Sequence, residues 1–288
     1  GGFGGSLKNF TPAQLGTICA KDALRRAKIS PEEVESCIVG KVIHNGPKDA
    51  YLARVIALDS GLSDTSHAVT LNRLCGSGLE AIIQAAQQIQ LGEVKVALAG
   101  GAESMSTSAY TLESNRWGQK MGNSVVVDEL TTTLQDPWNN LHMGITAENV
   151  ADKYNISRKA QDTYAASSHS KAAKAIDNGY FKEQIVPVEI KSRKGIQLFD
   201  TDEHVRPDTT AESLSTLKPY FKKEGSVTAA TSSGINDGAS MVVLMSEQKA
   251  LTDGLQPLGR LIGYARAGVA PELMGTGPIP AVHQVFQK

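Results

Sequence analysis

The sequence is poor in cysteine and in clustered metal-ligating side chains. It has three cysteines, Cys19, Cys37 and Cys75, and no Cys-x-x-Cys pair, so a disulfide framework is not expected. Cys19 and Cys37 lie in apolar patterns, where a free cysteine usually packs as a small hydrophobe. The six histidines show neither His-x-x-x-His nor His-Glu-x-x-His spacing. We therefore expect no metal site.

Long apolar runs and an excess of one charge are also missing. No apolar run approaches the roughly 20 residues of a membrane span. The opening residues Gly1–Gly5 lack the charged start and apolar stretch of a signal peptide. A net charge of -1 favours neither nucleic acid nor an anionic membrane as a partner. We expect a cytoplasmic protein, and the mitochondrial matrix stays open because a removed transit peptide leaves no trace.

The first hundred residues alternate between helix and strand patterns. Strands are predicted at residues 37–43, 67–71 and 94–99, and helices begin at Pro12 and Leu79. At 288 residues, with 41% apolar and 20% charged residues, the chain can bury a sizeable core. Strands that alternate with helices of this length predict an α/β fold with a mostly parallel sheet.

The residue composition changes in the middle of the chain, where residues 107–234 are rich in loop and turn residues. Two helices are predicted there, at about 146–154 and 158–177. Strand character returns at 240–245, and a further strand is predicted at 258–264. This pattern favours a loop-rich subdomain inserted into the α/β region.

The most informative segment is residues 72–80, Asn-Arg-Leu-Cys-Gly-Ser-Gly-Leu-Glu. A predicted strand ends there, a glycine-rich turn carries Cys75, and an apolar-periodic helix begins. Glycines allow a tight turn and close approach of a ligand. The helix N-terminus favours a thiolate, and the backbone N–H of Cys75 could help to hold an oxyanion. Cys75 is therefore a candidate nucleophile, although a cysteine beside a glycine turn is on its own more often structural.

Residues 72–79 resemble the nucleophile motif of thiolases. Four more segments resemble thiolase segments, in the same order and at the same spacing. They are Gly-Gly-Ala-Glu-Ser-Met-Ser at 100–106, His-Met-Gly-Ile-Thr-Ala-Glu-Asn-Val-Ala at 142–151, the stretch 227–239 that ends Asn-Asp-Gly-Ala, and Met-Gly-Thr-Gly-Pro-Ile-Pro-Ala at 274–281. The form that begins at His142 is similar to the biosynthetic acetyl-CoA acetyltransferase or broad β-ketothiolase branch.

The resemblance implies an α/β thiolase fold, a layered αβαβα core of two similar halves with an inserted loop domain. Residues 1–106 and 235–254 would form the N-terminal half that carries the nucleophile. Residues 107–234 would form the loop domain, which binds CoA, and 255–288 would begin the C-terminal half. Residues 115–129 would join dimers into a homotetramer.

The resemblance also implies the chemistry. Cys75 would accept an acyl group as a thioester, which a CoA enolate then attacks to give 3-oxoacyl-CoA, or CoA thiolate in the reverse direction. Coenzyme A or acetyl-CoA would be a substrate, with no permanently bound cofactor. Arg206 would suit the phosphates of CoA, and Ser233 the pantetheine amides. The residues implied to line the CoA tunnel are His142, Met143, Arg206, Ser213, Phe221, Ala229, Ser233 and Met274.

Some family segments have no counterpart in this sequence. They are Asn-Glu-Ala-Phe, Gly-His-Pro with its base, and the Cys-x-Gly-Gly-Gly segment that supplies an acid/base cysteine. A Claisen condensation needs a base, so we expect no thiolysis from these 288 residues alone and expect them to be part of a longer protein. The family's usual Gly-Asn-Ala is also replaced by Ala-Thr-Ser at residues 230–232.

Three other interpretations remain open at this point. A β-ketoacyl synthase would share the superfamily and an active cysteine, but it binds a carrier protein and has different flanking motifs. A truncated pseudoenzyme would bind CoA or only oligomerise. A redox or structural protein would keep Cys75 buried and would not react with acyl-CoA.

Overall fold

The computed structural model describes residues 1–193 and 195–288, which form two compact units. The first unit consists of Gly1–Leu130, Val186–Asp200 and Ile235–Ile262, and the second of Thr131–Ile185, Thr201–Gly234 and Gly263–Lys288. No helix in the described ranges is both long and apolar enough to cross a membrane.

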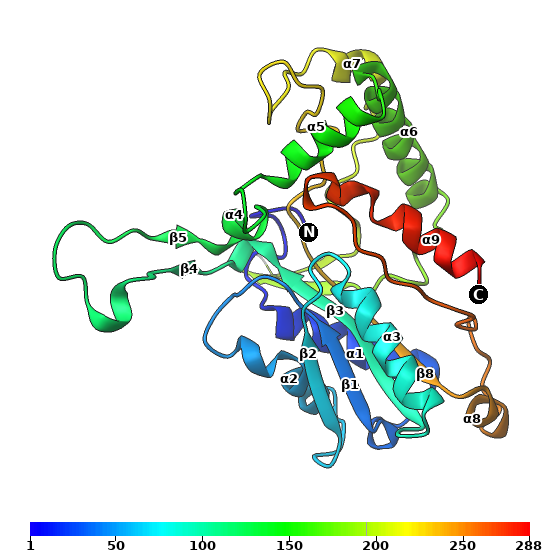
Figure 1. Cartoon of the computed structure of the whole chain (residues 1–288). Helices are drawn as coiled ribbons and strands as arrows, with labels where there is room; N and C mark the ends of the chain where they lie inside the picture. The colour runs from blue at the N-terminus through cyan, green and yellow to red at the C-terminus, as the bar shows by residue number, and fades with distance from the viewer. Residues whose placement is uncertain (194) are drawn as a thin grey trace. The chain divides into compact units, whose positions relative to one another are not determined.

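The first unit is built on a four-stranded sheet with the strand order β2-β1-β3-β8 (Figure 1). Strand β1 (Ser36–Gly40) pairs in parallel with β2 (His67–Leu71) and β3 (Val96–Ser104). Strand β8 (Asp237–Met245) pairs antiparallel with β3. These four strands and their mostly parallel arrangement were predicted, although β1 ends at Gly40, before its predicted end, and β3 extends beyond its own.

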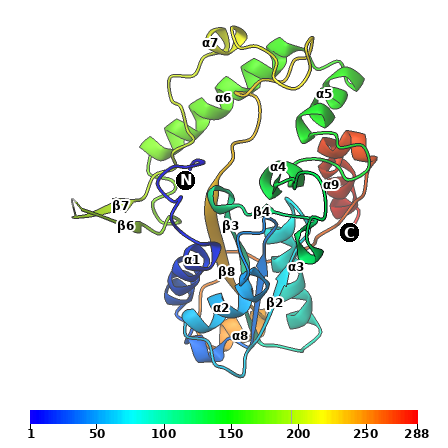
Figure 2. The same ribbon diagram turned by 90° about the vertical axis from the view of Figure 1, so that its left-hand side faces the viewer.

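Helices cover both faces of this sheet (Figures 1 and 2). Helices α1 (Pro12–Ala27) and α2 (Leu52–Asp59) pack on one face, and α3 (Ser77–Gln90) packs on the other. Successive side chains of a strand point to opposite faces, so Val39 joins the core under α1 and α2 while Ile38 joins the core under α3. Burial on both faces explains why β1 runs Cys-Ile-Val without polar alternation, and its one polar side chain, Ser36, is buried with its hydroxyl bonded to Gln88.

The first unit also carries elements that the sequence patterns did not predict. A two-stranded arm, β4 (Tyr110–Thr111) and β5 (Val127–Asp128), extends from the sheet region (Figure 1). A hairpin, β6 (Val188–Ser192) and β7 (Gly195–Phe199), lies in a stretch that was expected to be turn-rich. It belongs to this unit because Val188 packs with the apolar side chains near the N-terminus. The shorter elements are η1 (Pro31–Glu33), η2 (Asp49–Tyr51), η3 (Met105–Thr107), η4 (Asn115–Trp117) and α8 (Glu247–Thr252).

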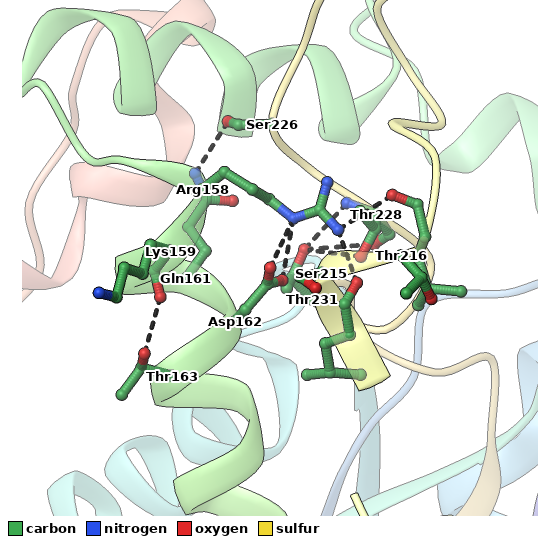
Figure 3. A network of polar contacts seen from close by, with 12 residues as sticks. Arg158, Lys159, Gln161, Asp162, Thr163, Ser215, Thr216, Ser226, Thr228 and Thr231 are labelled. Atoms are coloured by element: carbon green, nitrogen blue, oxygen red, sulfur yellow. Dashed lines mark hydrogen bonds and ion pairs between the residues drawn. The ribbon is translucent and has the colours of Figure 1, made fainter. Parts of the chain in front are cut away.

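The second unit is mainly helical. Helices α5 (Met143–Lys153) and α6 (Arg158–Asp177) confirm the two predicted helices, and the side chain of Ser157 caps α6. The other elements of the second unit are α7 (Ala211–Ser215), η5 (Pro271–Thr276) and α9 (Pro278–Phe286), and α4 (Glu129–Thr133) begins in the first unit and ends in the second. Arg158 fastens α7 to α6: it binds Asp162 of its own helix at 2.8 Å and donates to the carbonyl of Leu214 at 2.7 Å (Figure 3).

The strand predicted at 258–264 is wrong. Within the described residues these positions pair with no strand, and Leu258 and Ile262 are fully or almost fully exposed. An apolar run becomes a strand only where a neighbouring strand accepts its backbone hydrogen bonds. The compact units also divide the chain differently from the expected domains, because residues 107–130 fall with the sheet and 263–288 with the helical unit. The assignment of domains to thiolase halves stays a prediction.

Candidate active site

Cys75 sits in a tight turn between β2 and α3. The preceding residue, Leu74, has a left-handed backbone with φ 47°, which costs a non-glycine residue about 1–2 kcal/mol. Local bonds hold it there, because Asn72 Oδ1 accepts the N–H of Leu74 at 2.8 Å and Ser77 Oγ donates to its carbonyl at 2.6 Å. Ser77 Oγ also accepts the N–H of Arg73 at 2.8 Å. Strain that its surroundings enforce in this way is typical of functional turns.

Small residues allow α3 to begin directly against the sheet. A Cβ on Gly40, the last residue of β1, would lie 2.4 Å from the carbonyl carbon of Ser77 and 2.6 Å from the backbone nitrogen of Gly78. Only glycine fits there without moving the helix. The carboxyl end of a parallel strand is also where open α/β sheets bind ligands. Cys75 is therefore placed at the edge of the sheet where a ligand site is expected.

A cavity of about 330 Å³ opens beside Cys75 within the first unit. Its wall comes from the ends of β1 and β3, the nucleophile turn and the start of β8. The lining residues are Gly40, Lys41, Val42, Leu74, Cys75, Ser77, Gly78, Gly101, Ala102, Glu103, Gly238, Ala239 and Ser240. Three of the five resembling segments thus meet at one cavity.

The three cysteines differ sharply in exposure. Cys75 is exposed, whereas Cys37 is buried and Cys19 is partly buried. Burial raises the pKa of Cys37 to about 12, and burial together with Asp22 raises the pKa of Cys19 to about 11. Thiols with such pKa values are poor nucleophiles at neutral pH. The interpretation in which Cys75 is a buried structural residue is wrong, and the cores hold Cys19 and Cys37 instead.

Two charged residues, Lys41 and Glu103, line the cavity, and no role was predicted for either. The buried Lys41 forms an ion pair with Asp49 at 2.6 Å. Burial would raise the pKa of Asp49, but Lys41 and the backbone N–H groups of Asn45 and Gly46 outweigh it and lower that pKa. Glu103, on β3, accepts the backbone N–H groups of Val42 and Ile43 (Oε2 to N 2.9 Å, Oε1 to N 3.2 Å). For Glu103 burial dominates and the pKa is raised.

A signal for these residues was present in the sequence. Lys41 directly follows β1, which is buried at every position, and Glu103 interrupts the small and apolar residues of β3. Charged groups at such positions must be paired or hydrogen-bonded, because burying them alone is costly. A charge at the end of a buried strand therefore marks the place where the sheet meets a polar site.

His142 caps α5 in the second unit. Its Nδ1 accepts the N–H of Gly144 at 3.0 Å, so Nε2 carries the proton of the neutral ring and is the nitrogen left to donate. The ring stacks on Phe221 with 4.9 Å between centroids. A Cβ on Gly144 would lie 2.3 Å from the Phe221 ring, so the glycine gives this ring its space. Of the eight predicted CoA-contacting residues, His142 and Phe221 are in direct contact.

The remaining predicted residues lie on other segments of the second unit. Met274, on η5, is 42% exposed and lies near α5, where Asn149 donates to the carbonyl of Glu272 at 3.1 Å. Met143 is the partly buried first residue of α5, and Ala229 and Ser233 are exposed on the segment after Val227.

Arg206 and Ser213 attach to α6 rather than to α5. The side chain of Arg206 is exposed, and its backbone N–H donates to Nδ1 of His169 at 3.2 Å. Ser213 Oγ is engaged in the cap of α7, where it donates to the carbonyl of Thr210 at 2.9 Å. The Ser213 hydroxyl therefore already has a partner within its own helix.

The comparisons with known proteins agree with this geometry. The family model "Thiolase, N-terminal domain" matches residues 1–248. The chain belongs to the thiolase family. Beta-ketothiolase BktB of Cupriavidus necator is 51% identical over the whole of this chain, which covers 73% of that relative. The mitochondrial 3-ketoacyl-CoA thiolase of Rattus norvegicus is 44% identical at the same coverage.

Solved thiolases share the fold. The acetyl-CoA acetyltransferase of Bacillus anthracis superposes with a TM-score of 0.95 at 47% identity, over 100% of this chain and 73% of the other. Human mitochondrial 3-ketoacyl-CoA thiolase in complex with CoA gives a TM-score of 0.95 at 42% identity, over 100% of this chain and 72% of the other. The predicted thiolase fold is thereby confirmed for this member of the family.

Proposed function

We propose that this thiolase-family chain provides the nucleophile and the CoA-contacting residues of an acyltransferase that forms and cleaves 3-oxoacyl-CoA. The observation that carries the proposal is the placement of Cys75. It is exposed, it lies at the start of α3, and it faces a cavity at the carboxyl edge of the parallel strands. The named relatives, a beta-ketothiolase and a 3-ketoacyl-CoA thiolase, support the same chemistry.

The reaction proceeds in two acyl transfers. The Cys75 thiolate attacks the carbonyl carbon of an acyl-CoA, a C–S bond forms, and CoA leaves as its thiolate. The enolate of a second acetyl-CoA, formed by loss of an α-proton to a base, then attacks the thioester carbon. A C–C bond forms, the Cys75 thiolate leaves, and 3-oxoacyl-CoA is released. Thiolysis is the reverse, with CoA thiolate as the attacking group.

Coenzyme A enters this scheme as a substrate, and its contacts are assigned to the second unit. The protonated Nε2 of His142 and the exposed hydroxyl of Ser233 offer hydrogen-bond donors, and Phe221 and Met274 offer apolar surface. The exposed guanidinium of Arg206 suits a phosphate. Met143, Ser213 and Ala229 complete the proposed set. A human relative solved with CoA supports the ligand class.

We assign the arm β4–β5 to assembly into a homotetramer. Its side chains include several large apolar groups that are more than half exposed, namely Tyr110, Trp117, Met121, Val125 and Val126. Such a concentration of exposed apolar surface marks an interaction site. The cytoplasm is the proposed compartment, with the mitochondrial matrix as the alternative because five relatives have mitochondrial names.

Intact-mass spectrometry after brief exposure of the protein to acetyl-CoA tests the proposal. We expect one acetyl adduct on the wild type, no adduct on Cys75→Ala, and an unchanged adduct on the matched variant Cys19→Ala. A folded protein that binds CoA but gains no adduct would support the pseudoenzyme alternative instead. Acylation from an acyl carrier protein but not from acetyl-CoA would favour a β-ketoacyl synthase.

A further inference from the structure

The wall of the Cys75 cavity includes a loop whose two ends are bound by carboxylates. This loop, residues 41–46, leaves the end of β1 and is called here the floor loop. It contributes Lys41 and Val42 to the lining of the cavity. Glu103 binds its beginning and Asp49 binds its end.

Both carboxylate oxygens of Glu103 accept hydrogen bonds from the floor loop. One accepts the N–H of Val42 at 2.9 Å and the other the N–H of Ile43 at 3.2 Å. Charge-assisted bonds to backbone N–H groups are stronger than bonds between neutral groups. Glu103 is itself one of the lining residues, so it lies beside the part of the wall that it holds.

Asp49 fixes the other end of the floor loop. It pairs with the buried Lys41 ammonium at 2.6 Å and accepts the N–H of Gly46 at 3.1 Å and that of Asn45. Asn45 in turn donates from its side chain to the carbonyl of Ser104, at the end of β3, at 2.6 Å. Polar bonds therefore hold both ends of the loop, to β3 and to each other, while Ile43 between them is buried.

We propose that Glu103 is a positioning residue that limits the size of the acyl group on Cys75. It acts through the floor loop: by fixing the backbone of Val42 and Ile43 it fixes the wall formed by Lys41 and Val42. This inference rests on the proposed function, since it takes the cavity to hold the acyl chain. Lys41 and Val42 bound one side of the cavity of about 330 Å³, so the position of their backbone sets how far an acyl chain can extend on that side.

The test compares acyl groups of two sizes. Initial rates of Cys75 acylation by acetyl-CoA and by hexanoyl-CoA are measured by intact mass for the wild type, Glu103→Gln and Asp49→Asn. Glutamine keeps the shape of Glu103 but offers one acceptor instead of two. We expect the hexanoyl-to-acetyl ratio to rise about fivefold in each variant, the change expected for the loss of roughly one net hydrogen bond. Glu93→Gln, the same change at an exposed position before β3, should leave the ratio unchanged.

Each outcome either supports or refutes the positioning role of Glu103. An unchanged ratio in Glu103→Gln, or an equal fall of both rates, would mean a purely structural role and would overturn the proposal. If the folded wild type takes neither acyl group, the proposed function fails, and the role of Glu103 is then judged by alkylation of Cys75. A raised rate with N-ethylmaleimide relative to iodoacetamide in Glu103→Gln would still support the positioning role, and an identical ratio would refute it.

Discussion

The carboxylate of Glu148 accepts the backbone N–H of Val227 at 2.8 Å and that of Ser226 at 2.9 Å. Glu148 is buried on α5, in the same motif as His142, and Val227 begins the segment that carries Ala229 and Ser233. One side chain thus joins two groups of proposed CoA contacts that are about eighty residues apart in the chain. The glutamate of the motif is explained by this bond rather than by contact with a ligand.

Replacing Glu148 by glutamine should weaken CoA binding. The amide can accept through one oxygen only and would present its NH₂ group to a backbone N–H, so the segment after Val227 loses its fixed position. Bonds to a charged group contribute about 1.5–3 kcal/mol each, and we expect CoA affinity to fall about tenfold. Isothermal titration with CoA measures this. Glu183→Gln, an exposed glutamate of the same unit, is the control, and equal affinity in both variants would contradict the role of Glu148.

Gly144→Ala should destabilise the second unit. The added methyl would lie 2.3 Å from the Phe221 ring, which must then move away from His142. Overpacking of this kind costs about 1–3 kcal/mol, and urea unfolding of the variant measures it. Gly268→Ala, where a Cβ meets nothing within 4 Å, should be close to neutral. A Gly144→Ala variant as stable as Gly268→Ala would show that Phe221 is not held against α5.

Above pH 9, the free energy of unfolding should depend on pH through the ionisation of Cys37. Its pKa is raised by burial from 9.0 to about 12, so the folded chain resists ionisation of this thiol. The stabilisation is complete below pH 9, where the thiol is protonated in both states, and is lost as the pH rises toward 12 because the unfolded chain ionises first. The free energy of unfolding of Cys37→Ala should therefore depend less on pH across this range. Parallel pH profiles for both proteins would contradict this.

Much of the fold was predictable because the local signals were consistent. Strand β2 has the predicted bounds, α1 begins at Pro12 as predicted, and Cys75 lies in the predicted turn between strand and helix. Each of these follows from periodicity and turn chemistry within a dozen residues. The thiolase family itself followed from five ordered segments, and the family match confirms it.

The parts that escaped prediction depend on partners distant in the sequence. The hairpin β6–β7 forms where Val188 packs against Leu7 and Leu15, and the sequence near residue 188 contains no pattern that predicts this contact. The hydrogen bond between Glu103 and Val42 spans 61 positions, so the sequence shows a charged residue in β3 but not the loop that it binds. The run at 258–264 shows the converse, because its apolar residues suggest a strand but no neighbouring strand pairs with them in the described chain.

Assembly should depend on the exposed apolar tip of the arm. Trp117 is 88% exposed and Met121 86% exposed, and exposed groups of this size gain free energy when a partner covers them. Replacing both with serine should therefore lower the oligomeric state of the protein, measured as mass by light scattering during size-exclusion chromatography. The sheet and the Cys75 cavity lie outside the arm, so alkylation of Cys75 by iodoacetamide should keep its wild-type rate. The exposed Tyr164 on α6, replaced by serine, is the control for a general loss of surface aromatic area. If the double variant keeps the wild-type mass, the arm is not part of the assembly interface.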